Sequence, residues 1–168
     1  TPAMLQFLNN QQNKKDHPNE NFAREVMELF TLGRGNYTEQ DVKEAARAFT
    51  GYAFDKTGEF KFRTQQHDFG TKTFQGKTGT FSGEDILQII LEKKECASFI
   101  TKKIYKYFVN DTVDETIVQQ LATQFYQSNY DIKSLMKTMF SSSWFYDEKN
   151  IGAKIKSPVE LIAGMFRL

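Results

Sequence analysis

Residues 19–30 constrain the fold more than any other stretch, because they combine strong helix formers with a dense pattern of charge. At about 100° per residue, one side of such a helix collects apolar side chains. These side chains are Phe22, Ala23, Val26, Met27, Leu29 and Phe30. So wide an apolar arc predicts burial over most of the helix circumference. The sequence therefore predicts a mainly α-helical protein organised around this segment.

The other side of this helix carries a narrow polar stripe of Asn21, Arg24, Glu25 and Glu28. In one interpretation the stripe is a solvated face held by ion pairs between residues four apart, Glu20 with Arg24 and Arg24 with Glu28. Charged helix faces are usually of this kind. In the other interpretation the stripe lines a polar cleft, because little of the helix perimeter is left for solvent. Its carboxylates would then bind a cation or a polar ligand.

Helix caps followed by apolar periodicity recur along the rest of the chain. Thr38, Asp131 and Ser157 each stand where an N-cap is needed, and Ser157 opens a capping box with Pro at the first helical position. The length suits one domain with a hydrophobic core. We therefore expect a single mostly helical domain over residues 1–168, folded as a multi-helix orthogonal bundle. The chain begins without an initiator Met and ends within an apolar segment, so we expect a fragment of a longer protein.

The periodicity changes after the third predicted helix. Tyr52 and Phe54, then Phe60 and Phe62, alternate with polar residues on either side of a turn at 55–58. Alternation with a period of two around a short turn is typical of a β-hairpin. The sequence therefore predicts a small β-hairpin insertion at about residues 52–80.

Composition limits the classes of partner. The chain has 22 Lys and Arg against 21 Asp and Glu, a formal net charge of +1, so no global field favours nucleic acid. The single cysteine, Cys96, excludes an internal disulfide and a cysteine-rich zinc site. No stretch approaches the roughly 20 apolar residues of a membrane span. We expect no nucleic-acid partner and no transmembrane segment in this chain.

His67 and Asp68 form a second candidate site. Adjacent side chains in an extended strand point to opposite faces, so the pair can hold one metal ion only if the chain turns there, as Gly70 would allow. In a structural alternative, Asp68 caps the amides of Gly70 and Thr71 while His67 hydrogen-bonds a neighbouring carbonyl. Both alternatives stay open from the residues alone.

A metal site also needs ligands from elsewhere in the chain. If the loop around residue 67 folds over the polar stripe, nitrogen and oxygen ligands for a divalent metal ion come together. The candidate catalytic and metal-binding residues are Glu25, Glu28, His67 and Asp68. The candidate ligand-binding residues are Asn21, Arg24 and Lys72. The reaction and the cofactor stay open, with a divalent metal ion as the candidate cofactor.

Several runs along the chain resemble one bacterial family. These runs are PAML at 2–5, NENFARE at 19–25, MEL at 27–29, TLG at 31–33, YT at 37–38, DV at 41–42, ARA at 46–48 and TG at 50–51, with HD at 67–68 and KSPVE at 156–160. They are similar to motifs in the later part of the domain that is catalogued as domain of unknown function 1800. The chain departs from the family pattern at Phe22, where Tyr is common, and at Tyr52, where Trp is usual. The resemblance implies an exported bacterial protein, in the periplasm or outside the cell, but no biochemical activity.

Two classes of function remain. The favoured one is a non-enzymatic extracytoplasmic binding or assembly module, with a polar cleft on the helix at 19–30 and a protein or polysaccharide partner. It is favoured because no nucleophile and base stand at a recognisable spacing and the chain has only two His. The alternative is a metal-assisted or carboxylate-dependent hydrolase that acts on polysaccharide. A glycosidase of this kind needs two carboxylates at a defined separation across a groove.

Overall fold

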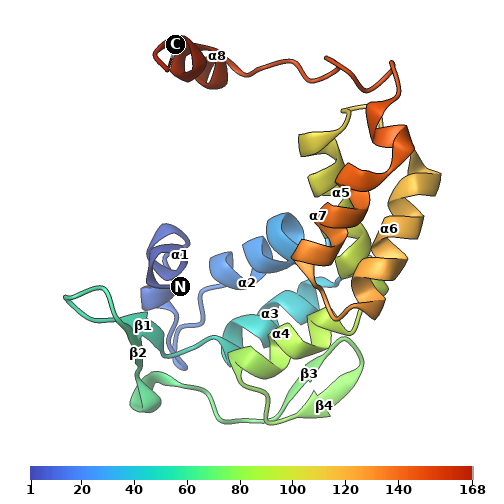
Figure 1. Cartoon of the computed structure of the whole chain (residues 1–168). Helices are drawn as coiled ribbons and strands as arrows, with labels where there is room; N and C mark the ends of the chain where they lie inside the picture. The colour runs from blue at the N-terminus through green and yellow to red at the C-terminus, as the bar shows by residue number, and fades with distance from the viewer. Residues whose placement is uncertain (168) are drawn as a thin grey trace. The chain divides into compact units, whose positions relative to one another are not determined.

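Most helices form where the sequence supplies caps. The computed structural model describes residues 1–167, in two compact units: one comprises Thr1–Cys96 and the other begins at Ala97. The helices are α1 (Pro2–Phe7), α2 (Asn21–Glu25), α3 (Glu39–Ala48), α4 (Gly83–Leu91), α5 (Lys94–Phe108), α6 (Glu115–Gln127), α7 (Ile132–Ser141) and α8 (Pro158–Met165) (Figure 1). The predicted N-caps Thr38, Asp131 and Ser157 each accept a backbone amide at the start of a helix. The mainly α-helical class is confirmed, whereas the orthogonal arrangement and the single domain stay predictions.

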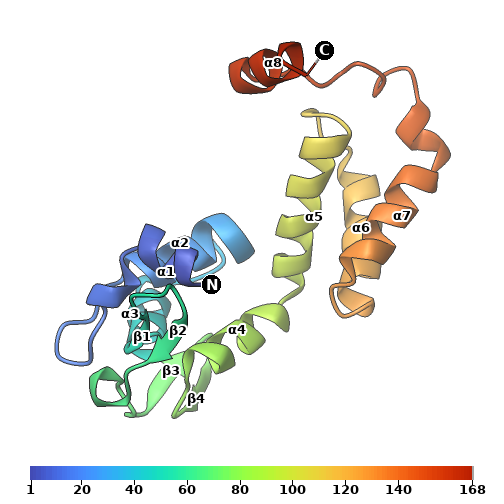
Figure 2. The ribbon, with the colours of Figure 1, turned by 60° about the vertical axis from the view of Figure 1, so that its left-hand side comes forward.

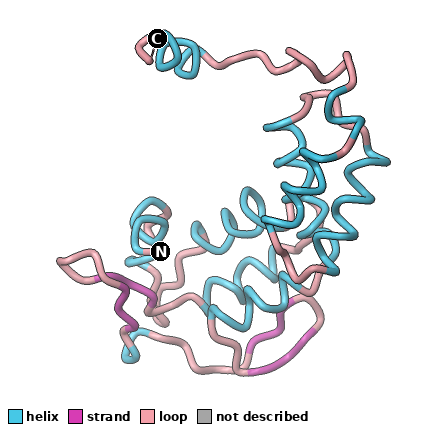
Figure 3. The backbone as a smooth tube through the Cα atoms, viewed as in Figure 1, coloured by secondary structure: helices cyan, strands magenta, loops and turns pink. Residues whose placement is uncertain are grey.

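Two antiparallel hairpins lie between α3 and α4 (Figure 3). In the first, β1 (Tyr52–Phe54) pairs with β2 (Phe60–Phe62) so that Tyr52 faces Phe62, which confirms the predicted hairpin and its turn. The second pairs β3 (Lys72–Phe74) with β4 (Lys77–Gly79) and was not predicted. Its two turn residues, Gln75 and Gly76, have φ angles of 49° and 78°. Positive φ at both positions matches a type I′ turn, in which Asn or Gly is the usual first residue and Gln is not.

The helix predicted at residues 19–30 is not a regular α-helix throughout. After α2 the backbone continues as a π-helix, Val26–Thr31, and the amide of Leu32 bonds the carbonyl of Met27 five residues back at 2.8 Å. A π-helical turn holds more residues than an α-helical one, so the 100° wheel fails here. Leu29 and Phe30 are 46% and 45% exposed, and Leu32 is buried at 1%. The prediction that Leu29 and Phe30 face the core is therefore wrong.

Two buried asparagines join the N-terminal segment to the end of α3. Asn10 Nδ2 donates to the carbonyls of Phe49 and Tyr52, at 3.2 and 2.9 Å. Asn13 Nδ2 donates to the carbonyl of Ala46 at 2.8 Å. Ala46 and Phe49 lie in the last turn and at the C-cap of α3, and Tyr52 is the first residue of β1. The N-terminal segment therefore supplies hydrogen bonds both to the end of α3, where carbonyls lack a following helical turn, and to the start of β1.

The second unit has its own core between α5, α6 and α7, which lie side by side in two views (Figures 1 and 2). The buried side chains are Ala97, Tyr105, Val109, Val118, Leu121, Phe125, Leu135 and Met139. Trp144 stacks on Tyr105 with ring centroids 6.1 Å apart, which extends this apolar core. Within residues 1–167, none of the helices has the length and apolar character to cross a lipid bilayer.

Candidate functional site

The polar stripe of the predicted helix is a surface of ion pairs. Arg24 binds Glu20 at 3.0 Å, the predicted pair, and also holds Glu39 with two hydrogen bonds of 2.7 Å. Glu28 does not pair with Arg24 as predicted, but accepts hydrogen bonds from Arg34 and Tyr37. The hydrogen bond from Arg34 is the main reason that the pKa of Glu28 lies below its usual range. Two arginines of the chain itself, Arg24 and Arg34, therefore already pair with the carboxylates of Glu20, Glu28 and Glu39.

Exposure limits what this network contributes to stability. The side chain of Arg24 is 33% exposed, and that of its partner Glu39 is 72% exposed. Ion pairs with this much solvent exposure are weakened by water and by salt. We expect Arg24→Met to lower the free energy of unfolding by only about 0.5 kcal/mol, measured by urea denaturation. A loss above about 2 kcal/mol would instead indicate a buried ionic network.

The other two stripe residues are Asn21 and Glu25. Asn21 Nδ2 donates to the carbonyl of Leu8 at 3.1 Å, which ties α2 to the end of α1. Glu25 is partly buried at the end of α2. Neither residue lines the two pockets of this unit that are described below.

His67 and Asp68 make two of the contacts of the structural alternative, the bond of His67 to a carbonyl and the bond of Asp68 to the Gly70 amide. His67 is buried, and its Nδ1 donates to the carbonyl of Thr50 at 2.8 Å. Asp68 accepts the amide of Gly70 at 2.8 Å and the guanidinium of Arg47 at 2.7 Å. Both side chains therefore hold the loop in place.

Lys72 is buried beside this loop. Its Nζ donates to the carbonyls of Asp68 and Gly70 at 2.6 and 2.9 Å. Burial lowers the pKa of Lys72, because it disfavours the charged ammonium. Nζ bonds backbone within its own loop, so the contacts seen for Lys72 are structural.

The four candidate metal ligands are not brought together. Within residues 1–167, no group of three or more His, Cys, Asp or Glu side chains has the arrangement of a metal site. Glu28 and Asp68 each accept hydrogen bonds from a different arginine, Arg34 and Arg47. The structure thus gives no geometric support to a shared site of Glu25, Glu28, His67 and Asp68.

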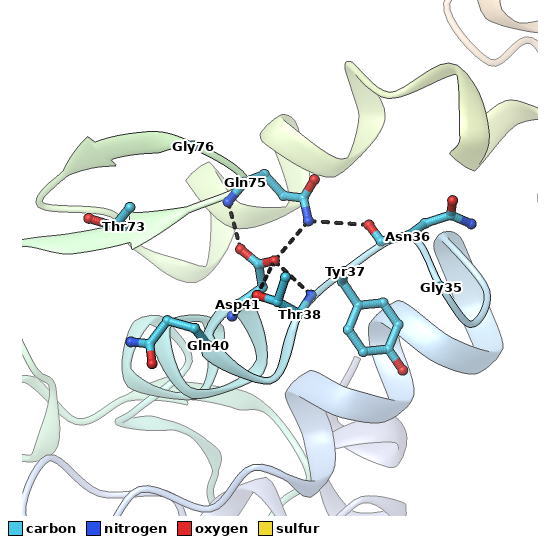
Figure 4. Close-up of a pocket in the computed structure, with 9 residues that line it drawn as sticks. All are labelled: Gly35, Asn36, Tyr37, Thr38, Gln40, Asp41, Thr73, Gln75 and Gly76. Carbon is cyan, nitrogen blue, oxygen red and sulfur yellow. Dashed lines mark hydrogen bonds between the residues drawn. The ribbon is translucent and has the colours of Figure 1, made fainter.

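A polar pocket of about 500 Å³ lies where the β3–β4 hairpin meets the start of α3 (Figure 4). Asp41 is at its centre. One carboxylate oxygen accepts the amide of Gln75 at 2.7 Å, and the other accepts the amide and hydroxyl of Thr38, both at 2.8 Å. Burial alone would raise the pKa of Asp41, but these hydrogen bonds outweigh it and hold the pKa below its usual range. Asp41 therefore fastens the hairpin to the helix, and its acceptor positions are committed.

A second pocket of the same unit, of about 370 Å³, has a different character. It is lined by Tyr52, Phe60, Phe62, His67, Phe69, Thr80, Ser82 and Glu84, and we call it the aromatic pocket. The β1–β2 register places Tyr52 opposite Phe62, and Phe60 lies two residues away on the same face. The loop after β2 adds His67 and Phe69. Ring alternation in the hairpin thus builds one wall, and the following loop builds another.

The polar groups of the aromatic pocket are few and oriented. The Tyr52 hydroxyl donates to the carboxylate of Glu84 and accepts the amide of Gly83 at 3.1 Å. Burial, reinforced by the bond to Glu84, raises the pKa of Tyr52. Tyr52 therefore keeps its proton at neutral pH and acts as a donor. His67 uses Nδ1 on the Thr50 carbonyl, so in the neutral ring Nε2 is the acceptor.

Sequence reasoning missed most of this pocket. It identified His67, and it placed Tyr52, Phe60 and Phe62 in a hairpin without seeing a site. The alternating aromatics were the available signal, because one hairpin face carries them all. Nothing in the sequence marked Glu84 as a pocket residue, because an acidic residue in the first turn of a helix is expected from the helix dipole alone.

The described chain is thus a mainly α-helical protein with two small hairpins and an aromatic pocket. The chain belongs to the family described as "Protein of unknown function (DUF1800)", whose model matches residues 1–168. The resemblance drawn from the sequence motifs is therefore confirmed. No curated protein and no solved structure matches the chain significantly.

Proposed function

We propose that this chain is a non-enzymatic binding module and that the aromatic pocket is its ligand site. The observation that carries the proposal is the pocket itself: apolar rings line about 370 Å³, with a few oriented polar groups. Ligand sites in proteins typically combine an apolar, preformed concavity with a small number of placed polar groups. The polar stripe supports a binding role less well, because the carboxylate of Glu28 and the guanidinium of Arg24 are both paired within the chain.

The chemistry of the lining favours binding over hydrolysis. Of the described residues, the only carboxylate that lines the aromatic pocket is Glu84. Glycosidases of the usual kind need two carboxylates on opposite sides of the bond that breaks. Tyr52 keeps its proton and is held by Glu84, so it is not poised as a nucleophile. The pocket therefore has recognition groups without a matched acid and base.

We further propose that the module works outside the bacterial cytoplasm, in the periplasm or at the cell exterior. The resemblance to the family motivates this proposal, because members are typically predicted to be exported. The ligand would then be a small group, free or carried by a protein or polysaccharide partner.

Ligand-observed NMR tests the proposal with a panel of one sugar, one aromatic and one cation: cellobiose, indole and choline. We expect at least one probe to receive saturation from the protein. Phe62→Ala removes a wall of the pocket and should weaken that binding about tenfold. The matched control is Phe7→Ala, which removes an exposed ring of the same unit outside the pocket. No signal from any probe, or equal loss in both variants, would overturn the proposal.

A further inference from the structure

The rings of the aromatic pocket stand nearly at right angles to one another. Tyr52 meets Phe60 and Phe62 at 63° and 78°, with centroids 5.6 and 5.5 Å apart. His67 meets Phe62 and Phe69 at 60° and 80°, with centroids 5.1 and 4.5 Å apart. Perpendicular neighbours form the corner of a box, in contrast to a flat platform. Because these rings are steeply inclined to one another, their faces point in different directions around the pocket that they line.

The three phenylalanines of the pocket are not covered by the rest of the protein. Phe60, Phe62 and Phe69 are 51%, 40% and 61% exposed. A ring face carries partial negative charge, so several faces around one space attract a cation. Recognition of quaternary ammonium groups by aromatic cages rests on this attraction.

The charged residue that lines the pocket also favours a cation. Glu84 is its one charged lining residue among those described, and no lysine or arginine there opposes it. Asp85 follows in the first turn of α4. A helix N-terminus contributes roughly half a positive charge, which two carboxylates outweigh. Among the lining residues described, the one carboxylate is therefore that of Glu84.

The hydrogen-bonding groups of the pocket are largely committed. The Tyr52 hydroxyl bonds Glu84 and Gly83, and the Ser82 hydroxyl shares the capping box with Asp85. A sugar presents many hydroxyls that need partners and stacks best on a flat face. A quaternary ammonium group has no N–H and therefore needs no hydrogen-bond acceptor. It presents methyl or methylene groups on all sides.

From these observations we infer that the aromatic pocket binds an organic cation, an alkylammonium group held between Tyr52, Phe62 and the carboxylate of Glu84. The inference rests on the proposed function and names its ligand class. The cation can come from a free small molecule or from a trimethylated lysine side chain of a partner. The shared chemistry is a quaternary ammonium group, which has no N–H to donate.

Matched probes test the inference on the whole chain. Choline is compared by NMR titration with 3,3-dimethylbutan-1-ol, which has the same shape but no charge. It is also compared with cellobiose and with a Gly-Lys-Gly peptide whose lysine is trimethylated and whose ends are acetylated and amidated. We expect choline or the lysine peptide to bind at least about fivefold more tightly than the neutral alcohol. Whichever cation binds more tightly identifies the source.

Two variants separate local charge from net charge. Glu84→Gln keeps an acceptor for Tyr52 and should weaken cation binding about fivefold, while binding of the neutral alcohol changes less than about twofold. Glu59→Gln makes the same charge change in the β1–β2 turn, outside the pocket lining, and should leave both unchanged. Equal affinity for choline and the alcohol, or binding of cellobiose alone, would overturn the cation inference but keep the binding module. Binding of no probe would overturn both.

Discussion

Replacing Gly83 by alanine is expected to lower the free energy of unfolding by about 2 kcal/mol, although alanine is the better helix former. A Cβ atom here would lie 2.5 and 2.6 Å from two ring carbons of Phe49 and 2.9 Å from Cζ of Tyr52. Phe49 is buried and packs edge-on against both Phe22 and Tyr52, so neither ring can move without loosening the core. Urea denaturation measures the loss.

The matched control for this substitution is Gly164→Ala in α8. Nothing lies within 4 Å of a Cβ at Gly164, and its φ is compatible with a side chain. We expect this variant to be as stable as the wild type or slightly more stable. If Gly83→Ala were equally harmless, the close packing of α4 on Phe49 and Tyr52 would be contradicted.

Removing Arg47 should have the other large effect. We expect Arg47→Met to cost about 2 kcal/mol at neutral pH, less than the roughly 3–5 kcal/mol of a fully buried ion pair because the arginine is partly exposed. Arg47 binds Asp68 at 2.7 Å and Glu44 at 2.8 Å, and both carboxylates are largely shielded from water. Without the guanidinium, both carboxylates lose this ion-pair partner. Arg24→Met, in the exposed network, is the control with the same charge change.

The loss in Arg47→Met should depend on pH. Burial alone would raise the pKa of Asp68, but hydrogen bonds from Arg47 and the Gly70 amide outweigh it, and the pKa is lowered. A carboxyl whose pKa is lower in the folded state stabilises the fold above its unfolded pKa, about 3.9, and this contribution disappears as pH falls through the folded pKa. The difference between wild type and variant should therefore shrink from pH 7 to pH 3. An equal difference at both pH values would contradict the role of Asp68.

Local signals in the sequence predicted much of the fold. N-caps such as Thr38 and Ser157 act on amides two or three residues away, so spacing alone reveals them. The Glu20–Arg24 pair was visible for the same reason. The slip into π-helix at Val26–Thr31 had no comparable signal, because it depends on which residues the core accepts. The β3–β4 turn was missed because Gln75 is unusual at a positive φ.

The candidate site was less predictable than the fold. The hairpin pattern revealed Tyr52 and Phe62, but the carboxylate bonded to Tyr52 comes from Glu84, 32 residues later. That meeting depends on Gly83 allowing α4 to approach Tyr52 closely. Likewise Arg47 and Asp68 are 21 residues apart, and only the packed loop joins them. Contacts of this range follow from tertiary packing, which a local pattern does not encode.

The hydrogen bonds of Asn10 and Asn13 also link the stability of two distant segments. Asn10 and Asn13 donate to carbonyls 33 to 42 residues further along the chain. Closing a loop of that length costs entropy, and a buried polar group that loses its partner is costly. Local unfolding of the segment before α2 therefore removes hydrogen bonds from the end of α3 and the start of β1. The two regions support each other's order although they are far apart in sequence.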